Sequence, residues 1–240
     1  MTELLFLEDA YLQEADGRVV GQTEGGGIVL DRTVFYPQGG GQPGDSGRLE
    51  WDGGSIEVAT TVKGEAGQVV LVPVPSDVPL PPIGEPLRQV LNWKRRLRHM
   101  RVHTGLHLLS VVIPLPVSGG AIGSDKGRLD FDMPDAIDDK AGVEVALKEM
   151  IDRGLSVTED WITDAELAAN PGLVKTMSVK PPTGQGRVRL IRIGSGATQV
   201  DLQPCGGTHV RNTAEIGQIR LGKIEKKGAR NRRVNMLLAD

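Results

Sequence analysis

The sequence predicts an α+β protein in which a small N-terminal β-barrel-like domain precedes a larger α+β domain. Two observations lead to this fold class. Short alternating apolar runs separated by Gly, Asp and Pro fill the first part of the chain. A long stretch at helical spacing follows, and the remainder mixes amphipathic helical patterns with further alternating runs. We expect the two domains to comprise residues 1–88 and 89–240.

The strands of the first domain are expected in the runs LLFLEDAYLQEADGRVV, GGGIVLDRTVFYP, SGRLEWDGGSIEVATTV and GQVVLVPV. Each run alternates in polarity and ends at turn-forming residues, which is typical of half-buried strands. Their spacing favours a small barrel or sandwich. The run PQGGGQPGDSG is too rich in Gly and Pro for regular structure, and the Pro-rich residues 72–86 place the domain boundary at their end.

Helical spacing over residues 88–111 predicts one long helix at the start of the second domain. DDKAGVEVALKEMIDRG predicts an amphipathic helix with acidic residues in its first turn and Gly154 as its stop. WITDAELAANPGL predicts a short helix capped by Thr163 or Asp164. The tail is expected to be strands, in the runs GRVRLIRIG, TQVDLQPCGGTHV, EIGQIRLGKIEKKG and RRVNMLLAD.

Composition narrows the class of protein. With 39% hydrophobic and 25% charged residues the chain is of ordinary soluble type, and no segment approaches the roughly 20 apolar residues of a membrane span. The N-terminus lacks a basic signal region and a single Cys excludes an internal disulfide, so we expect a cytoplasmic protein without a membrane partner. A net charge of −3 argues against bulk electrostatic binding to nucleic acid, and 3% aromatic residues against a stacking platform for single-stranded bases.

Two residue pairs at the same interval point to a metal site. His103 and His107 are four residues apart on the predicted helix, so both imidazoles project from one face. Cys205 and His209 repeat that interval in PCGGTHV, where two glycines permit a tight fold. One thiolate and three imidazoles suit Zn²⁺, which we expect as the cofactor.

Each pair has a plainer interpretation. A helical His pair can be an ordinary polar face, and a lone Cys is often a small buried hydrophobe. The metal site is favoured because the single Cys and three of the four His occur at matching intervals. Four protein ligands would close a structural site, whereas three and a water would leave a catalytic one, and both remain open. The remaining histidine, His99, is expected at a solvated helix position and not as a ligand.

Two basic clusters stand out against the acidic average, KRRLRHMR at residues 94–101 and KIEKKGARNRR at 223–233. Each is either a solvated charged face or a surface that contacts RNA phosphates. The residues expected to contact RNA are Arg95, Arg96, Lys226, Lys227, Arg230, Arg232 and Arg233.

A family resemblance rests on several of these motifs together. HTGLH followed about a hundred residues later by CGGTH resembles the zinc signature of alanyl-tRNA editing domains. LDRTVFYPQGGGQPGDSG is similar to the Gly-rich signature of the free-standing alanyl-tRNA editing proteins (the AlaX type) and of the editing domain in alanyl-tRNA synthetase. MRVHTGLHLLS, VDLQPCGGTHVRNTAEIG and KGARNRRV follow in that family's order, so the resemblance covers almost the whole chain and suggests the stand-alone form.

The resemblance implies an enzyme, an aminoacyl-tRNA deacylase that acts in trans with Zn²⁺. Its implied substrate is tRNA(Ala) mischarged with Ser or Gly. It also implies that Thr33 and Gln42 face the amino acid, whereas without it Thr33 is simply a β-branched strand residue. Two alternatives remain open, a zinc-stabilised tRNA-binding module without turnover and a metallohydrolase acting on a small ester or amide.

Overall fold

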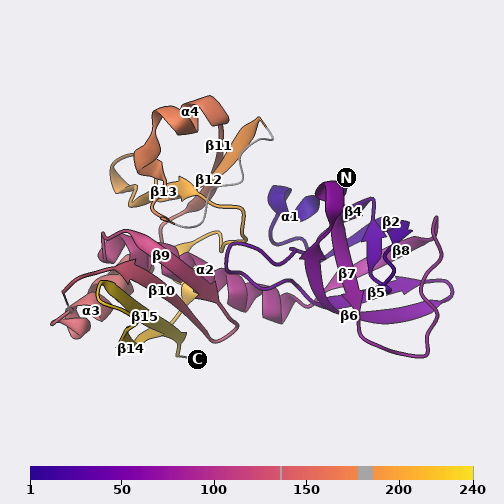
Figure 1. Cartoon of the computed structure of the whole chain (residues 1–240), viewed down its shortest axis with the longest axis horizontal. Coiled ribbons are helices and arrows are strands. Elements are labelled where there is room, and N and C mark those ends of the chain that lie inside the picture. Colours follow the sequence, from indigo (N-terminus) through magenta and orange to yellow (C-terminus); the bar gives the residue numbers. More distant parts are fainter. Residues whose placement is uncertain (136, 178–185, 240) are drawn as a thin grey trace. The chain divides into compact units, whose positions relative to one another are not determined.

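The structure is a computed structural model that describes residues 1–135, 137–177 and 186–239. The chain forms two compact units, Met1–Leu97 and Arg98–Asp240, which are described separately (Figure 1). The first contains a closed barrel and the second combines sheets with helices, so the predicted α+β class and N-terminal barrel are confirmed. None of the helices within the described ranges is long and apolar enough to cross a membrane.

The barrel strands follow one another in the order β2-β3-β7-β6-β5-β8, and each neighbouring pair is antiparallel. Their bounds are β2 Glu14–Gln22, β3 Ile28–Leu30, β5 Gly47–Trp51, β6 Gly54–Lys63, β7 Val69–Pro73 and β8 Pro86–Leu91. Apolar side chains fill the interior, including Leu30, Phe35, Leu49 and Leu71, all fully buried. Closure pairs every barrel strand on both sides, which removes free edges.

The first predicted run is a strand only in its second half. α1 (Leu5–Glu8) is a single helical turn, preceded by β1 (Glu3–Leu4), which pairs in parallel with β4 (Arg32–Thr33). Phe6, on this turn, is 2% exposed. Its ring packs edge-to-face against the ring of Tyr36, with 5.4 Å between the ring centroids. This aromatic contact accounts for the departure from a continuous strand, because it requires the chain to turn after β1.

The long helix begins later than predicted. Residues 86–91 form β8, which closes the barrel, and the helix α2 spans Trp93–Val112. The buried residues of β8 alternate along it: Leu87, Gln89 and Leu91. Six residues are too few to distinguish this alternation from helical spacing, so the sequence pattern placed the start of the helix too early. The side chain of Asn92 then accepts a hydrogen bond from the backbone N–H of Arg95 at 3.2 Å and marks the true start.

The Gly-rich run forms an irregular turn, as predicted. The backbones of Gly39 and Gln42 exchange two hydrogen bonds, of 3.1 and 2.9 Å. Between them Gly40 and Gly41 have positive φ angles of 55° and 82°, which glycine adopts without strain.

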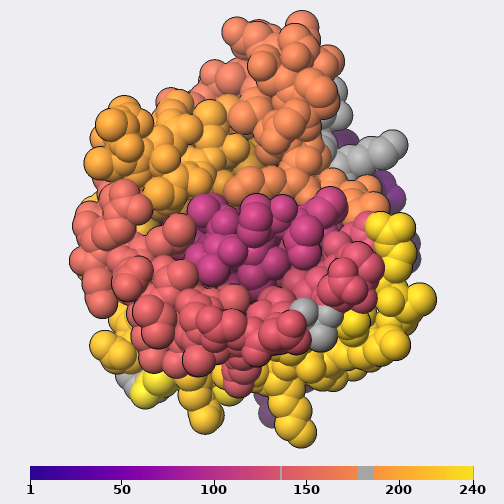
Figure 2. Space-filling view, turned by 90° about the vertical axis from the view of Figure 1, so that its left-hand side faces the viewer, coloured from indigo at the N-terminus to yellow at the C-terminus, as the bar shows by residue number. Residues whose placement is uncertain are grey.

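The second unit contains two antiparallel sheets, in the orders β14-β15-β10-β9 and β11-β12-β13. Their strands are β9 Val117–Ile122, β10 Lys126–Asp132, β11 Val157–Thr163, β12 Arg187–Ile193, β13 Asp201–Pro204, β14 Ile219–Lys226 and β15 Asn231–Leu238. In Figure 2, orange atoms of the segment with β11 and α4 (Asp164–Ala169) project from the top of the face. The strands predicted in the tail are confirmed.

The two remaining predicted helices are confirmed, with one detail corrected. In α3 (Lys140–Asp152) the acidic residue precedes the first turn, where Asp139 caps the helix by accepting a 2.7 Å hydrogen bond from the N–H of Gly142. Gly154, with φ +61°, follows the helix end as predicted. Thr163 is the N-cap of α4 and forms a capping box with Glu166.

Candidate metal centre

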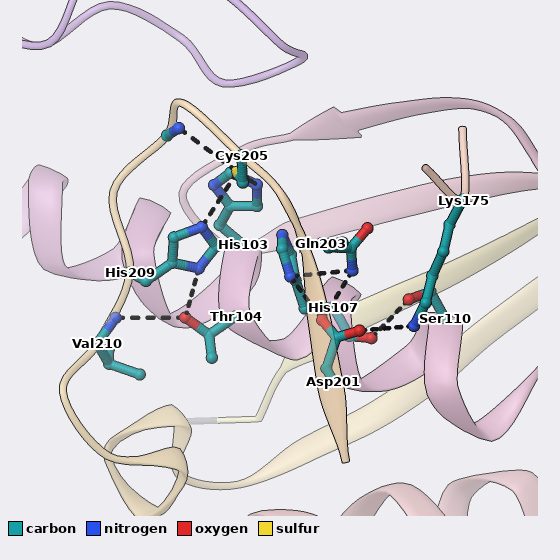
Figure 3. Close-up of polar contacts among 11 residues, drawn as sticks. His103, Thr104, His107, Ser110, Lys175, Asp201, Gln203, Cys205, His209 and Val210 are labelled. Carbon is teal, nitrogen blue, oxygen red and sulfur yellow. Dashed lines mark hydrogen bonds and ion pairs between the residues drawn. The ribbon is translucent and has the colours of Figure 1, made fainter. Parts of the chain in front are cut away.

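Four side chains from α2 and from the loop after β13 converge in the second unit (Figure 3). One ligand atom from each of His103, His107, Cys205 and His209 lies within 4.8 Å of the other three. The three imidazoles are 5–8% exposed, while Cys205 is partly exposed. The structure therefore brings together the four residues that the sequence singled out, from segments about a hundred residues apart.

The spacing of the donor atoms fits a tetrahedral ion. The sulfur of Cys205 lies 3.5 Å from Nε2 of His103 and 3.3 Å from Nε2 of His209. Zn²⁺ at about 2.3 Å from sulfur and about 2.05 Å from nitrogen would hold such atoms about 3.5 Å apart. The mixed S and N donor set also suits this borderline-soft ion.

His107 is oriented by a buried carboxylate. Its Nδ1 lies 3.0 Å from Oδ2 of Asp201, which leaves Nε2 for the cluster. The Gln203 amide donates to the same carboxylate oxygen at 2.8 Å, and Nζ of Lys175 donates to Oδ1 at 2.6 Å. A carboxylate behind a metal-binding imidazole fixes its tautomer and direction, so these contacts preorganise His107.

His209 is held in a similar way by a hydroxyl. Its Nδ1 lies 3.1 Å from Oγ1 of Thr104, and this oxygen also accepts the backbone N–H of Val210 at 3.2 Å. With Nε2 as the ligand atom, Nδ1–H donates to Thr104. Both ligands therefore present Nε2 to the centre.

Arg189 on β12 stabilises the loop that carries Cys205. Its guanidinium donates to the carbonyl oxygens of Cys205 at 3.0 Å and Gly207 at 2.8 Å, and it forms an ion pair with Glu159. The side chain is 3% exposed. The backbone N–H of Gly207 in turn donates to the Cys205 sulfur at 3.4 Å, which favours a thiolate.

The electrostatics of the cluster favour a metal-binding thiolate. Burial alone would raise the pKa of the Cys205 thiol, but the neighbouring His103 and His209 lower that pKa well below its usual value. Burial lowers the pKa of His209 well below the ordinary histidine value. Burial opposes protonation of His107 as well, but hydrogen bonds with Asp201 and Cys205 outweigh it and raise the pKa of His107 to about 9.

Three polar residues of the first unit that the sequence singled out are buried. Thr33 and Gln42 are 0% and 1% exposed, and the Thr33 hydroxyl donates to Oε1 of Gln89 at 2.8 Å. Arg96 is also fully buried; it forms an ion pair with Asp45 and donates to backbone carbonyls. Its guanidinium is therefore not available to phosphate, and the expectation that Arg96 contacts RNA is wrong.

His99 also departs from its expected environment. The side chain is 1% exposed, not solvated, and its Nε2 lies 3.4 Å from Oγ of Ser124. It stands outside the cluster of donor atoms, consistent with its expected exclusion from the ligands.

The second basic cluster forms the exposed hairpin between β14 and β15, but carboxylates engage much of its charge. Arg230 makes two hydrogen bonds to Asp132, of 3.0 and 2.9 Å, and Arg233 makes two to Asp130, of 2.8 and 3.0 Å. Further contacts link Lys227 to Glu225 and Arg232 to the carbonyls of Pro134 and Asp135. Phosphates would therefore have to compete with these partners.

The sequence motifs do not indicate five residues that support the cluster: Thr104, Lys175, Arg189, Asp201 and Gln203. A signal existed for two of them, because Asp201 and Gln203 alternate along β13 and so share a face of the strand that ends directly before the cysteine. Thr104 lies beside His103 on α2, but its contact with His209, like the contacts of Lys175 and Arg189, is visible only in the tertiary structure.

The fold and the site define an α+β protein with a barrel unit and a His/Cys centre suited to metal. Comparison with known proteins narrows this class. Residues 188–235 match the family described as threonyl and alanyl tRNA synthetase second additional domain. Residues 9–81 match the tRNA synthetases class II (A).

Full-length relatives extend these matches. The chain is 34% identical over 250 residues to the alanyl-tRNA editing protein AlaX-M of Methanosarcina acetivorans, with 100% of both chains covered. It is 33% identical over 239 residues to AlaX-M of Saccharolobus solfataricus, covering 98% of each. With alanine–tRNA ligase of Korarchaeum cryptofilum it shares 35% identity over 235 residues, 94% of this chain but 25% of the ligase.

The chain belongs to the family of free-standing alanyl-tRNA editing proteins of the AlaX type. The resemblance noted in the sequence is thereby confirmed. So is the expectation of an enzyme, an aminoacyl-tRNA deacylase.

Proposed function

We propose that this protein is a Zn²⁺-dependent editing enzyme that acts in trans on tRNA(Ala) mischarged with Ser, and also with Gly. The observation that carries the proposal is the convergence of four donor atoms within 4.8 Å in a member of the AlaX family. His103, His107, Cys205 and His209 would hold the ion. With four protein ligands, Zn²⁺ would supply Lewis acidity toward an ester carbonyl only by accepting a further ligand.

The surrounding side chains orient the proposed zinc ligands. Asp201 holds the ring of His107 through Nδ1, and Thr104 holds that of His209. Arg189 fixes the loop between Cys205 and Gly207. Such preorganisation matters because an aminoacyl ester is already labile, so the main task is to place it and exclude the wrong substrate.

Discrimination between Ser and Ala requires a group that recognises one hydroxyl. A site that hydrogen-bonds this hydroxyl rejects Ala, because Ala leaves the site's polar groups unpaired. Thr33 and Gln42 are our proposed residues for this contact. Thr33→Val removes the hydroxyl at nearly constant shape and should reduce the preference for Ser-tRNA(Ala) over Ala-tRNA(Ala), whereas Thr33→Ser should retain it.

Basic side chains are proposed to contact the tRNA backbone: Arg95, Lys226, Lys227, Arg230, Arg232 and Arg233. Phosphate contacts release counterions, so tRNA affinity should fall as salt increases. Each lysine or arginine that contacts a phosphate should reduce that salt dependence when it is neutralised.

We expect the protein to act in the cytoplasm.

Release of the amino acid from Ser-tRNA(Ala), Gly-tRNA(Ala) and Ala-tRNA(Ala) by the zinc-loaded protein tests the proposal. We expect selective loss of Ser or Gly, and no release by Cys205→Ala, whose metal content should fall with its activity. Full activity of metal-free protein would refute the zinc dependence. Stoichiometric tRNA binding without release would instead support a binding module, and hydrolysis only of small esters would indicate the other metallohydrolase.

A further inference from the structure

A tryptophan on the sheet of the metal centre is unusually open to solvent. Trp161, on β11, is 42% exposed, and the guanidinium carbon of Arg187 lies 4.4 Å from its ring centroid. The other two tryptophans, Trp51 and Trp93, pack against the barrel core. Single exposed apolar residues are common, so the position of Trp161 relative to the centre decides its meaning.

Trp161 lies in one row with the metal-binding cysteine. The N–H of Cys205 donates to the carbonyl of Arg189 at 3.1 Å, and Arg189 is directly opposite Trp161 in the ladder between β12 and β11. Opposed residues of antiparallel strands share a face. Two strand spacings separate the ends of this row, so the backbones of Cys205 and Trp161 are about 10 Å apart.

The row leads from the centre toward solvent. Asp201 and Gln203, on the same face of β13, are covered because they reach His107 on α2. The opposite end of the row is β11, the edge strand of the sheet beside β12 (Figure 1). Cys205 at the other end is partly exposed, Arg189 in the middle of the row is 3% exposed, and Trp161 at the β11 end is 42% exposed.

We propose that Trp161 and Arg187 form the subsite for the 3′-terminal nucleotide of the aminoacyl-tRNA. The base would stack on the indole, and the guanidinium would contact the base or its phosphate, as aromatic and arginine side chains do with unpaired nucleotides. An ester at the metal centre and a base on Trp161 would be joined by the ribose, which spans the row. This subsite rests on the proposed deacylase function.

The subsite also refines what the composition indicated. A 3% aromatic content argues against a platform for several bases, but the end of an acceptor strand needs only one stacking partner. Arg187 adds a charged group that is planar and can stack on a base, which the ammonium of a lysine cannot do.

Kinetics and direct binding on the zinc-loaded full chain test the subsite. Trp161→Ala should raise KM for Ser-tRNA(Ala) by about tenfold with kcat little changed, and Trp161→Phe should largely restore it, because stacking on an aromatic face is lost and regained. The affinity for 3′-(L-serylamino)-3′-deoxyadenosine 5′-monophosphate, a non-hydrolysable analogue, should fall in parallel. Arg187→Gln should weaken both, while Arg187→Lys should restore them only in part.

Two control variants remove comparable exposed groups from the same unit. Val145→Ala deletes an apolar side chain that is 54% exposed on α3, and Arg153→Gln removes an exposed charge after that helix. Neither should alter KM or analogue binding. Zinc content and circular dichroism should be equal in all variants.

The outcomes separate this subsite from the function on which it rests. Wild-type turnover with unchanged KM and unchanged analogue affinity in Trp161→Ala would overturn the subsite alone. No amino acid release by the wild type from any aminoacyl-tRNA would overturn the function. In that case, equal analogue binding by wild type and Trp161→Ala would overturn the subsite as well.

Discussion

At the scale of single residues, the cluster of three histidines and one cysteine was predictable because these residue types are rare in this chain. The only Cys and three of four His fall into two matching pairs, so rarity and spacing together indicated that they meet. Their supports were not predictable in the same way. Asp201 and Thr104 belong to abundant polar types, and their roles follow from contacts with His107 and with His209, distant in sequence.

Proton release on zinc binding should report the state of His107. Below its pKa of about 9 the metal-free imidazole carries a second proton, which the ion must displace. The lowered pKa values of Cys205 and His209 favour the deprotonated forms of these two side chains. Zinc binding near pH 7.5 should therefore release the second proton of His107, and this release should disappear well above pH 9.

Calorimetry in buffers of different ionisation enthalpy measures this proton count. Asp201→Asn removes the carboxylate that stabilises the charged ring, so fewer protons should be released at neutral pH. The same variant should bind zinc about 10–100-fold more weakly, the usual effect of losing such a partner. Asp160→Asn, on the same sheet but paired with Arg192, is the control. Equal proton release by the wild type and Asp201→Asn at neutral pH would contradict this assignment.

At the scale of elements, the sequence was informative about which segments are helix or strand and less so about where they meet. The barrel strands were recognised because alternation and turn residues are local properties. The β8–α2 junction was misplaced because alternation over Pro86–Leu91 also fits a helical pattern. Arg96 was assigned to RNA because its partner Asp45 is 51 residues away, so that no local pattern reveals the ion pair.

Arg96 is expected to stabilise the barrel unit. Its guanidinium anchors the first turn of α2 to Asp45 and to the carbonyls of Ala10 and Val34. Arg96→Met leaves the buried carboxylate uncompensated, which should lower the free energy of unfolding by about 3–5 kcal/mol. Lys94→Met, on the same turn but exposed, should change it by less than about 0.5 kcal/mol in urea titrations. Equal stability of the two variants would contradict a structural role.

Arg189 is expected to act through the cysteine loop. Arg189→Met keeps the length of the side chain but leaves the carbonyls of Cys205 and Gly207 without their donor. Zinc affinity, measured by competition with a chelator, should fall about 10–100-fold. Arg192→Met, on the same strand but facing the other side, should bind zinc like the wild type. An unaltered zinc affinity in Arg189→Met would remove Arg189 from the support of the centre.

At the scale of the whole molecule, the fold class followed from the order of patterns along the chain. Strand-like runs come first, and a mixture of helical and strand-like runs follows. This order was enough to predict the α+β class. The pairing of the tail strands was not predictable, because β12 joins β11 and β13 whereas β15 joins β10 and β14. Such pairings depend on long-range packing, which period and turn residues do not encode.

Metal removal should destabilise one unit selectively. The ligands all lie within Arg98–Asp240, so an ion bound there stabilises this unit, by about 4 kcal/mol when free zinc exceeds the dissociation constant a thousandfold. Chelation should therefore speed amide hydrogen exchange in β13 and leave the barrel strands unchanged. Cys205→Ala should exchange at the faster rate with or without chelator. Equal acceleration in both units would contradict a local effect.

The distance along the chain between the two halves of the centre has a consequence for biosynthesis. His103 and Cys205 are 102 residues apart, so at about 5–20 residues per second the ribosome releases the histidine pair about 5–20 s before the cysteine. During that interval a pair of imidazoles on a helix favours copper or nickel over zinc, following the general order of metal affinities. Only the thiolate and the third imidazole would complete a tetrahedral site, so the proposed zinc site should form only after Cys205 and His209 have emerged.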